Sequence, residues 1–331
     1  SPIKIDHVMF VKDITKTYSG SAEFSLTTAE RYNCLRFYGE ASSLIDVQPG
    51  DYVISGGVRF LVENAEGEFV DSPEAGTKSY MQFTVKLLSK NYVLQTPDGT
   101  AVSELTCIQS GGAAFTISQA TVTPNEITQY VFNDLAKTYE IDLKTLLPEL
   151  PVGCEYGKIL NRGCDFHFTD STYLDSNNYI FVSNEGILTL PIVSAHSANV
   201  NDQIGTVTVP IVSTNYRPFE LTIKVVIGQK IPLDQSGVSV SATDITYGQT
   251  LAESTLTATG SMTCPRMHTE IPGTFAWTDG TIKPNAGSYD AEWTFTPAEG
   301  YEEYAPATGK VTITVSPKSI EGATINLKQT S

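Results

Sequence analysis

The sequence is poor in charged residues and contains no long apolar run. Only 18% of its 331 residues are charged, and acids outnumber bases by 37 to 21. The net charge of −16 is spread evenly without a basic stripe, which disfavours nucleic acid as a partner. No apolar segment reaches the roughly 20 residues that a membrane-spanning helix needs, so we expect no direct membrane insertion.

Cysteine is also scarce, and this argues against a disulfide-stabilised scaffold. The five cysteines show no Cys-x-x-Cys spacing and are Cys34, Cys107, Cys154, Cys164 and Cys264. The sequence predicts buried thiols that pack as small apolar side chains. Disulfides between Cys154 and Cys164, or between Cys34 and Cys107, stay open as alternatives.

Motifs for catalysis and for cofactor binding are missing. The chain has no nucleophile elbow, zinc-protease helix, dinucleotide-binding loop, P-loop or EF-hand loop. No two histidines have the spacing of metal ligands; they are His7, His167, His196 and His268. We therefore expect no enzyme activity, no cofactor and no metal centre.

The C-terminal part of the chain has the period of two that is typical of strands with one buried face. Apolar and polar residues alternate in 289–296, with Trp293 on the apolar side, and again in 310–316. Turn-forming Gly, Pro and Asn residues separate these runs. We expect residues 229–316 to form an Ig-like β-sandwich with Trp277 and Trp293 in its core.

This part resembles a known kind of module. The similarity lies in Ile-Thr-Tyr-Gly-Gln at 245–249, Gly-Thr-Phe-Ala-Trp at 273–277, and Ala-Pro-Ala-Thr-Gly at 305–309. These stretches resemble the MBG-type Ig-like modules of long surface proteins from Gram-positive and gut bacteria. The resemblance implies a β-sandwich within a tandem array.

Residues 1–118 are expected to form another Ig-like β-sandwich. Apolar residues alternate with polar ones in 80–87, and Gly56-Gly57 reads as a tight connection between two strands. The Thr-Tyr-Ser-Gly turn at 17–20 and the Asn-Tyr-Val-Leu strand at 91–94 resemble the YDG-type repeat of bacterial surface proteins. In that repeat an Asp usually stands where this chain has Ser19.

Residues 119–228 are expected to form a third Ig-like β-sandwich. A short helical turn is predicted near 142–148, where Pro148 would end it. A hairpin is predicted over 179–190, and alternation continues in 219–227.

The two junctions look alike, since a strand, a two-residue link and a new strand occur in both 116–122 and 314–320. Such short links favour a semi-rigid rod. Residues 317–331 could then begin a further module of a longer chain, or pair back onto the preceding sandwich. The predicted fold is all-β, with three tandem Ig-like β-sandwich domains in an elongated array.

The best candidate for ligand binding is the stretch 165–179, rich in acids, amides and tyrosines. Oxygen-rich loops can hold Ca²⁺, and a tyrosine face can stack on a sugar ring. The candidate ligand-binding residues are Asp170, Tyr173, Asp175 and Tyr179. A plain solvated loop is the competing interpretation, and Tyr301 to Tyr304 form a second candidate.

These observations favour a non-enzymatic structural or adhesion protein, extracellular or on a bacterial surface. It would act as a spacer stalk that presents a binding region. Expected partners are a host or environmental glycan or protein, and neighbouring modules of the same chain. The alternative is a carbohydrate-binding accessory region of a secreted enzyme, which a solvent-facing row of aromatic residues would favour.

Overall fold

The computed structural model describes residues 1–161, 163–195 and 197–319. Strands dominate, and the chain divides into two compact units. The first unit comprises residues 1–129, 137–193 and 203–225, and the second comprises 130–136, 194–202 and the chain from Val226 onward. Within the described residues, no sheet crosses residue 118 or residue 228. We use the names N-terminal, middle and C-terminal sandwich for the three expected modules, residues 1–118, 119–228 and 229–316.

The N-terminal sandwich is built from short strands in four sheets. Their orders are β13-β10-β7-β4 with β8 on β7, β3-β14-β9, β2-β5-β6 and β1-β11-β12. The strands are β1 Ile3–Ile5, β2 His7–Phe10, β3 Ile14–Thr17, β4 Glu23–Phe24, β5 Leu35–Gly39, β6 Ser43–Ile45, β7 Tyr52–Glu63, β8 Phe69–Asp71, β9 Gly76–Lys78, β10 Tyr80–Leu87, β11 Tyr92–Gln95, β12 Ala101–Val102, β13 Glu104–Gln109 and β14 Phe115–Ser118.

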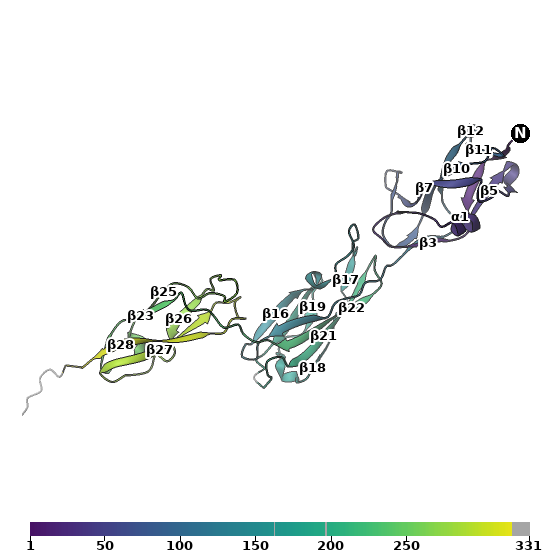
Figure 1. Ribbon diagram of the computed structural model, residues 1–331. Coiled ribbons are helices and arrows are strands. Elements are labelled where there is room, and N and C mark those ends of the chain that lie inside the picture. The colour runs from purple at the N-terminus through teal and green to yellow at the C-terminus, as the bar shows by residue number, and fades with distance from the viewer. Residues whose placement is uncertain (162, 196, 320–331) are drawn as a thin grey trace, which may run out of the picture. The chain divides into compact units, whose positions relative to one another are not determined.

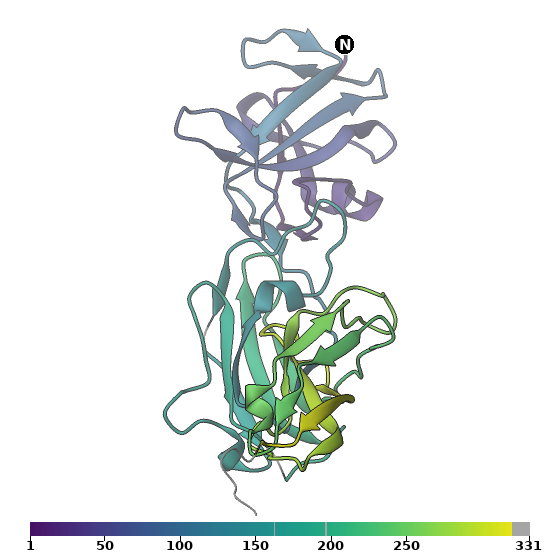
Figure 2. The ribbon, with the colours of Figure 1, turned by 90° about the vertical axis from the view of Figure 1, so that its left-hand side faces the viewer.

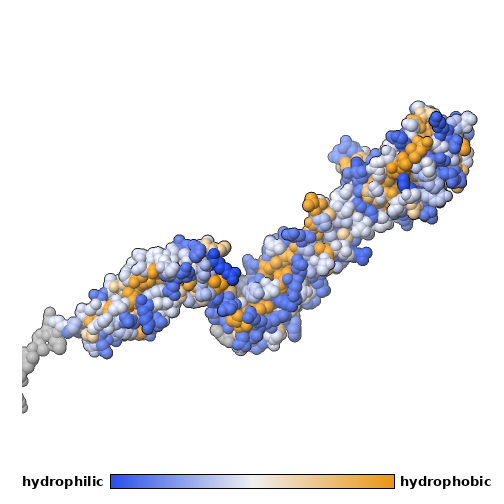
Figure 3. Space-filling model, in the orientation of Figure 1, coloured by the Kyte–Doolittle hydropathy of each residue, from blue (hydrophilic) through white to orange (hydrophobic). Residues whose placement is uncertain are grey.

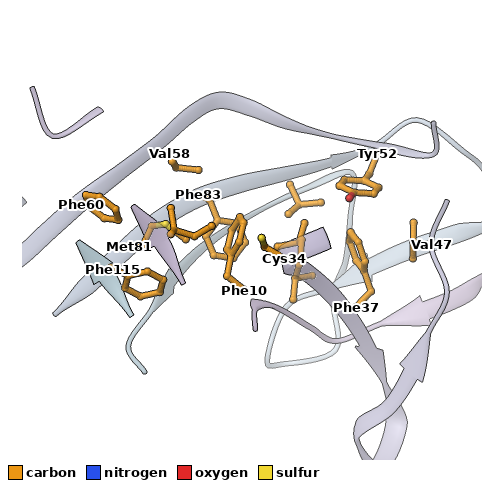
Figure 4. Packing of buried hydrophobic residues seen from close by; sticks show 14 of the residues in the cluster. Phe10, Cys34, Phe37, Val47, Tyr52, Val58, Phe60, Met81, Phe83 and Phe115 are labelled. Atoms are coloured by element: carbon orange, nitrogen blue, oxygen red, sulfur yellow. The ribbon is translucent and has the colours of Figure 1, made fainter. Parts of the chain in front are cut away.

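Aromatic side chains fill the core between these sheets. The rings of Phe10 and Phe83 meet edge to face with centroids 4.9 Å apart, and both side chains are fully buried. Phe60 and Phe115 lie to one side of this pair, and Phe37 lies on the other (Figure 4). The alternation predicted for residues 80–87 is confirmed, since Met81, Phe83 and Val85 are buried.

Two local predictions for this sandwich need correction. Gly56 and Gly57 do not connect two strands, because β7 runs through them and the register against β10 shifts there. Both glycines have a positive φ, so they form a β-bulge. Helix α1 (Thr28–Cys34), which Figure 2 shows at the outside of this sandwich, was not predicted from the sequence. A 3₁₀ turn, η1 (Glu40–Ser42), follows β5.

The middle sandwich has two sheets, ordered β15-β22-β21-β17 with β18 on β21, and β16-β20-β19. Its apolar faces meet in a core in which Leu188, Leu190, Val207 and Ile223 are fully buried. The elements are β15 Ile127–Val131, β16 Lys137–Asp142, η2 Leu143–Leu146, β17 Ile159–Asn161, β18 Asp165–Phe168, η3 Ser171–Tyr173, β19 Phe181–Val182, β20 Ile187–Ile192, β21 Gln203–Ser213 and β22 Phe219–Ile227. The 3₁₀ turn η2 occupies the segment expected to be helical before Pro148.

The C-terminal sandwich packs the pair β23-β25 against the sheet β24-β28-β27-β26 (Figure 1). Trp293 is 5% exposed, and the indole of Trp277 donates a 3.0 Å hydrogen bond to the Ser254 carbonyl. The elements are β23 Ser239–Ala242, β24 Ile245–Thr246, η4 Leu251–Glu253, β25 Leu256–Thr259, β26 Gly273–Trp277, β27 Gly287–Pro297 and β28 Ala307–Ser316. The all-β prediction is confirmed.

The cysteines, the C-terminal segment and the membrane prediction can also be compared with the structure. All five cysteines are free thiols, so neither Cys154–Cys164 nor Cys34–Cys107 forms a disulfide. Residues 317–319 are not in a strand, and the rest of the expected strand at 317–331 lies outside the described residues, as does His196. In the part of the chain that the structure describes, no helix has the length and apolar character needed to cross a bilayer.

Candidate functional site

The acidic residues of the predicted ligand-binding stretch form hydrogen bonds within the turns of that stretch. Asp170 caps η3, and its carboxylate accepts hydrogen bonds from the Thr172 backbone N–H at 2.9 Å and from the Thr172 hydroxyl at 2.7 Å. These bonds favour the ionised form, so they lower the pKa of Asp170. The side chain therefore acts as a helix cap.

Asp175 behaves in the same way one turn later. Its carboxylate accepts hydrogen bonds from the Asn177 N–H at 2.9 Å and from the Asn178 amide at 2.6 Å, and these bonds lower its pKa. Among residues 1–161, 163–195 and 197–319, no three His, Cys, Asp or Glu side chains are grouped to hold a metal ion. The suggestion of Ca²⁺ in this stretch has no supporting geometry.

The two candidate tyrosines have different environments. Tyr173 lies in η3 and is partly buried, and its carbonyl accepts a 2.8 Å hydrogen bond from the Val193 N–H. Tyr179 is 78% exposed. The next residue, Ile180, is buried, and Phe181, the first residue of β19, is 50% exposed. The exposed aromatic residues are therefore Tyr179 and Phe181, and Tyr173 is not one of them. The alternation of residues 179–181 in the sequence could have indicated Phe181.

The second sequence candidate is part of a core. Tyr304 is only 7% exposed and packs with Cys264 and Ile271, while its ring lies 6.5 Å from that of Tyr301. A hydrogen bond with the Cys264 thiol is the main cause that raises the pKa of Tyr304 to about 12. The Tyr301–Tyr304 stretch does not form an exposed stacking surface.

A different region shows a built arrangement of polar and aromatic groups, at the junction of the N-terminal and middle sandwiches within the first unit. Asn215 is 2% exposed. Its side-chain oxygen accepts a 2.8 Å hydrogen bond from the Ala75 N–H, and its amide donates a 3.0 Å bond to the Glu155 carbonyl. One side chain therefore satisfies backbone groups from both sandwiches.

Aromatic rings pack beside Asn215. The Tyr18 and Tyr216 rings meet edge to face with centroids 5.6 Å apart, and the Tyr156 ring lies 5.2 Å from that of Tyr216. The Tyr18 hydroxyl accepts a 3.0 Å hydrogen bond from the Glu155 N–H. Tyr18 belongs to the Thr-Tyr-Ser-Gly turn on which the YDG-type resemblance is based.

The backbones also approach closely at this junction. Gly20 has a φ of +77°, and a Cβ added there would lie 2.1 Å from the Gly153 carbonyl oxygen. No L-residue with a side chain fits that position without moving one of the two loops.

A cleft of about 820 Å³ opens next to these contacts. Its walls are mainly apolar or hydroxyl-bearing and include Val122, Ile127, Leu147, Tyr18 and Tyr216. Burial, followed by a hydrogen bond with the Cys154 thiol, raises the pKa of Tyr216 to about 12. The cleft could accept an uncharged group, and the raised pKa of Tyr216 keeps that hydroxyl protonated at neutral pH.

Comparisons with known proteins identify no family. No family model and no curated protein matches the chain. Among solved structures it is similar to protocadherin gamma B2 extracellular cadherin domains 1–5, at 10% identity and a TM-score of 0.24, over 96% of this chain and 60% of that one. It is also similar to Sidekick-1 immunoglobulin domains 1–5, at 11% identity and a TM-score of 0.24, over 95% of this chain and 60% of that one.

A third similar structure is mouse cadherin-23 EC22–24, at 9% identity and a TM-score of 0.22, over 94% of this chain and 96% of that one. The chain spans 60% of the length of each of the first two structures. Identity and TM-scores this low assign neither a function nor a ligand to the chain.

Proposed function

We propose that this chain is a non-enzymatic spacer that holds a binding region at a fixed distance and orientation. The observation that carries this proposal is the junction between the N-terminal and middle sandwiches. A single buried side chain, Asn215, bonds backbone groups from both, and the Tyr18 and Tyr216 rings pack against each other. A stalk needs joints of this kind, because a joint with few contacts bends freely.

The setting is part of the same proposal. Three tandem modules, the resemblance to MBG-type and YDG-type repeats and the even acidity together favour an extracellular or bacterial cell-surface location. The binding region would contact a host or environmental glycan or protein.

The alternative function, a carbohydrate-binding accessory region of a secreted enzyme, is favoured by one observation. The rings of Tyr179 and Phe181 are exposed, and Phe181 lies on the outer face of the sheet β16-β20-β19 in the middle sandwich. Both functions can share that face, and they differ in whether a catalytic domain lies elsewhere in the same protein.

Stiffness at the junction is measurable on the full chain. We expect residual dipolar couplings from the N-terminal and middle sandwiches of the wild-type protein to fit one common alignment tensor. Asn215→Ala removes the partners of the Ala75 N–H and the Glu155 carbonyl, and leaving such groups unpaired costs about 1–3 kcal/mol. In this variant the two sandwiches should require separate tensors.

Asn64→Ala is the matched control, because the Asn64 side-chain oxygen bonds only the Glu66 and Glu68 N–H groups of its own turn. It should keep the common tensor. Separate tensors in the wild-type protein would contradict the spacer function, since the two sandwiches would then move independently.

A further inference from the structure

Phe181 opens strand β19 on the outer face of the sheet β16-β20-β19, and Tyr179 precedes it by two residues, outside the strand. Tyr179 and Phe181 are 78% and 50% exposed, with the buried Ile180 between them. Exposure alternates over residues 179–181 as in an extended chain, in which side chains two residues apart lie roughly 7 Å apart and point the same way. Figure 3 shows several apolar patches, bordered by polar residues, on the drawn face of the molecule.

Polar groups lie beside these rings in a defined register. Phe181 pairs with Thr189 of β20, which in turn pairs with Glu140 of β16. Residues paired across neighbouring strands have Cβ atoms about 5 Å apart on the same face. One cross-strand row therefore presents an aromatic ring, a hydroxyl and a carboxylate in that order.

The charge of this face restricts what it can bind. Beyond Thr189 and Glu140, the positions on the same side of β16 and β20 are Thr138, Asp142, Ile187 and Pro191, of which Pro191 is buried. The two charged side chains among them, Glu140 and Asp142, are both carboxylates, and both residues are exposed. An anionic ligand would be repelled, whereas an uncharged ligand with hydroxyl groups would find acceptors.

We propose that this face, which we call the Tyr179–Phe181 platform, binds a neutral glycan chain. The Tyr179 and Phe181 rings stack on the apolar faces of sugar rings. Thr189 and Glu140 exchange hydrogen bonds with sugar hydroxyls next to the Phe181 ring. This inference names the ligand class of the binding region in the proposed spacer, and it stands whether or not the junction proves stiff.

A basic peptide is the main competitor, because carboxylates and aromatic rings also attract cations. The platform favours the glycan on two counts. The row through Phe181 contains one carboxylate beside a neutral hydroxyl. The other carboxylate of this face, Asp142, already accepts a 2.9 Å hydrogen bond from the Lys144 N–H.

Native affinity electrophoresis of the full chain tests the platform. Gels would contain xyloglucan, laminarin or galactomannan as neutral probes, and polygalacturonate or poly-lysine as charged ones. We expect at least one neutral polysaccharide to retard the wild-type chain, with no retardation by polygalacturonate. Tyr179→Ala and Phe181→Ala should each weaken the apparent affinity at least fivefold, and Phe181→Trp should preserve it.

Tyr247→Ala, at a tyrosine that is 50% exposed in the C-terminal sandwich, is the matched control and should bind like the wild type. Unchanged thermal unfolding would show that the platform variants are folded. The proposal is overturned if none of the three neutral polysaccharides retards the chain, or if retardation survives both alanine substitutions. Retardation by poly-lysine alone would replace the glycan with a basic peptide.

Discussion

At the scale of single residues, the neighbours Asn215 and Tyr216 stabilise the junction in different ways. Asn215 is buried because its amide replaces water for two backbone groups that would otherwise be unpaired. Tyr216 contributes ring contacts, with Tyr18 on one side and Tyr156 on the other. Its burial has a consequence for the response of the protein to alkaline pH.

The pKa of Tyr216 is raised from 10.0 to about 12 in the folded protein. The folded state therefore holds the phenol proton more tightly than the unfolded chain does. The resulting stability is fully present below pH 10 and is lost as the pH rises through 12. We expect the melting temperature, measured by circular dichroism, to fall more steeply between pH 10 and pH 12 in the wild-type protein than in Tyr216→Phe.

Tyr247→Phe, at an exposed position, serves as the control and should follow the wild-type curve. If Tyr216→Phe also followed the wild-type curve over this range, Tyr216 would not be the group that links the junction to pH.

At the scale of elements, two features of the N-terminal sandwich show how local chemistry shapes its strands. Helix α1 begins with a capping box, in which Thr27 and Glu30 bond each other's backbone N–H groups. That signature was present in the sequence and could have predicted the helix. The bulge at Gly56 and Gly57 could not be told from a turn, because a Gly-Gly pair suits both.

The bulge predicts different losses of stability for alanine at its two glycines. Both have a positive φ, so alanine strains the backbone at either position. Only at Gly57 would the new Cβ also meet backbone, 2.8 Å from the Phe24 carbonyl oxygen, whereas nothing lies within 4 Å of it at Gly56. We expect Gly57→Ala to destabilise the protein by about 1–3 kcal/mol more than Gly56→Ala in urea unfolding. Equal losses of stability for the two variants would mean that β4 moves away from the new Cβ at little cost.

At the scale of the whole molecule, the compact units do not follow the sequence modules one to one. The N-terminal sandwich and most of the middle sandwich belong to the first unit, while the C-terminal sandwich belongs to the second. The junction explains the first grouping, since Tyr216 of the middle sandwich belongs to the same buried cluster as the core of the N-terminal one.

Calorimetry of fragments tests this grouping. We expect residues 1–228 to unfold in one cooperative transition, because the shared buried cluster couples their two sandwiches. Residues 229–331 should unfold in a separate transition. Cutting at residue 228 separates residues 130–136 and 194–202 from the rest of the second unit. It also breaks the Lys230–Asp134 ion pair, which is 22% and 51% exposed and so contributes little. Two transitions within residues 1–228 would show that the junction does not couple the sandwiches.

The sequence by itself determined the fold class and most of the strands. Alternation in residues 80–87, 219–227 and 289–296 depends only on neighbours along the chain, because a strand with one buried face must repeat every two residues. Turn residues between the runs then marked where strands end. The same local logic placed the 3₁₀ turn before Pro148.

Only the tertiary structure decided which of these residues meet. Asn215 and Ala75 are 140 positions apart, and no local pattern announces their hydrogen bond. The structure also separated Tyr173 from Tyr179 and brought Phe181, Thr189 and Glu140 into one row. Local periodicity says which side of a strand is buried, but register and packing between distant segments decide which side chains come together, and those depend on the whole chain.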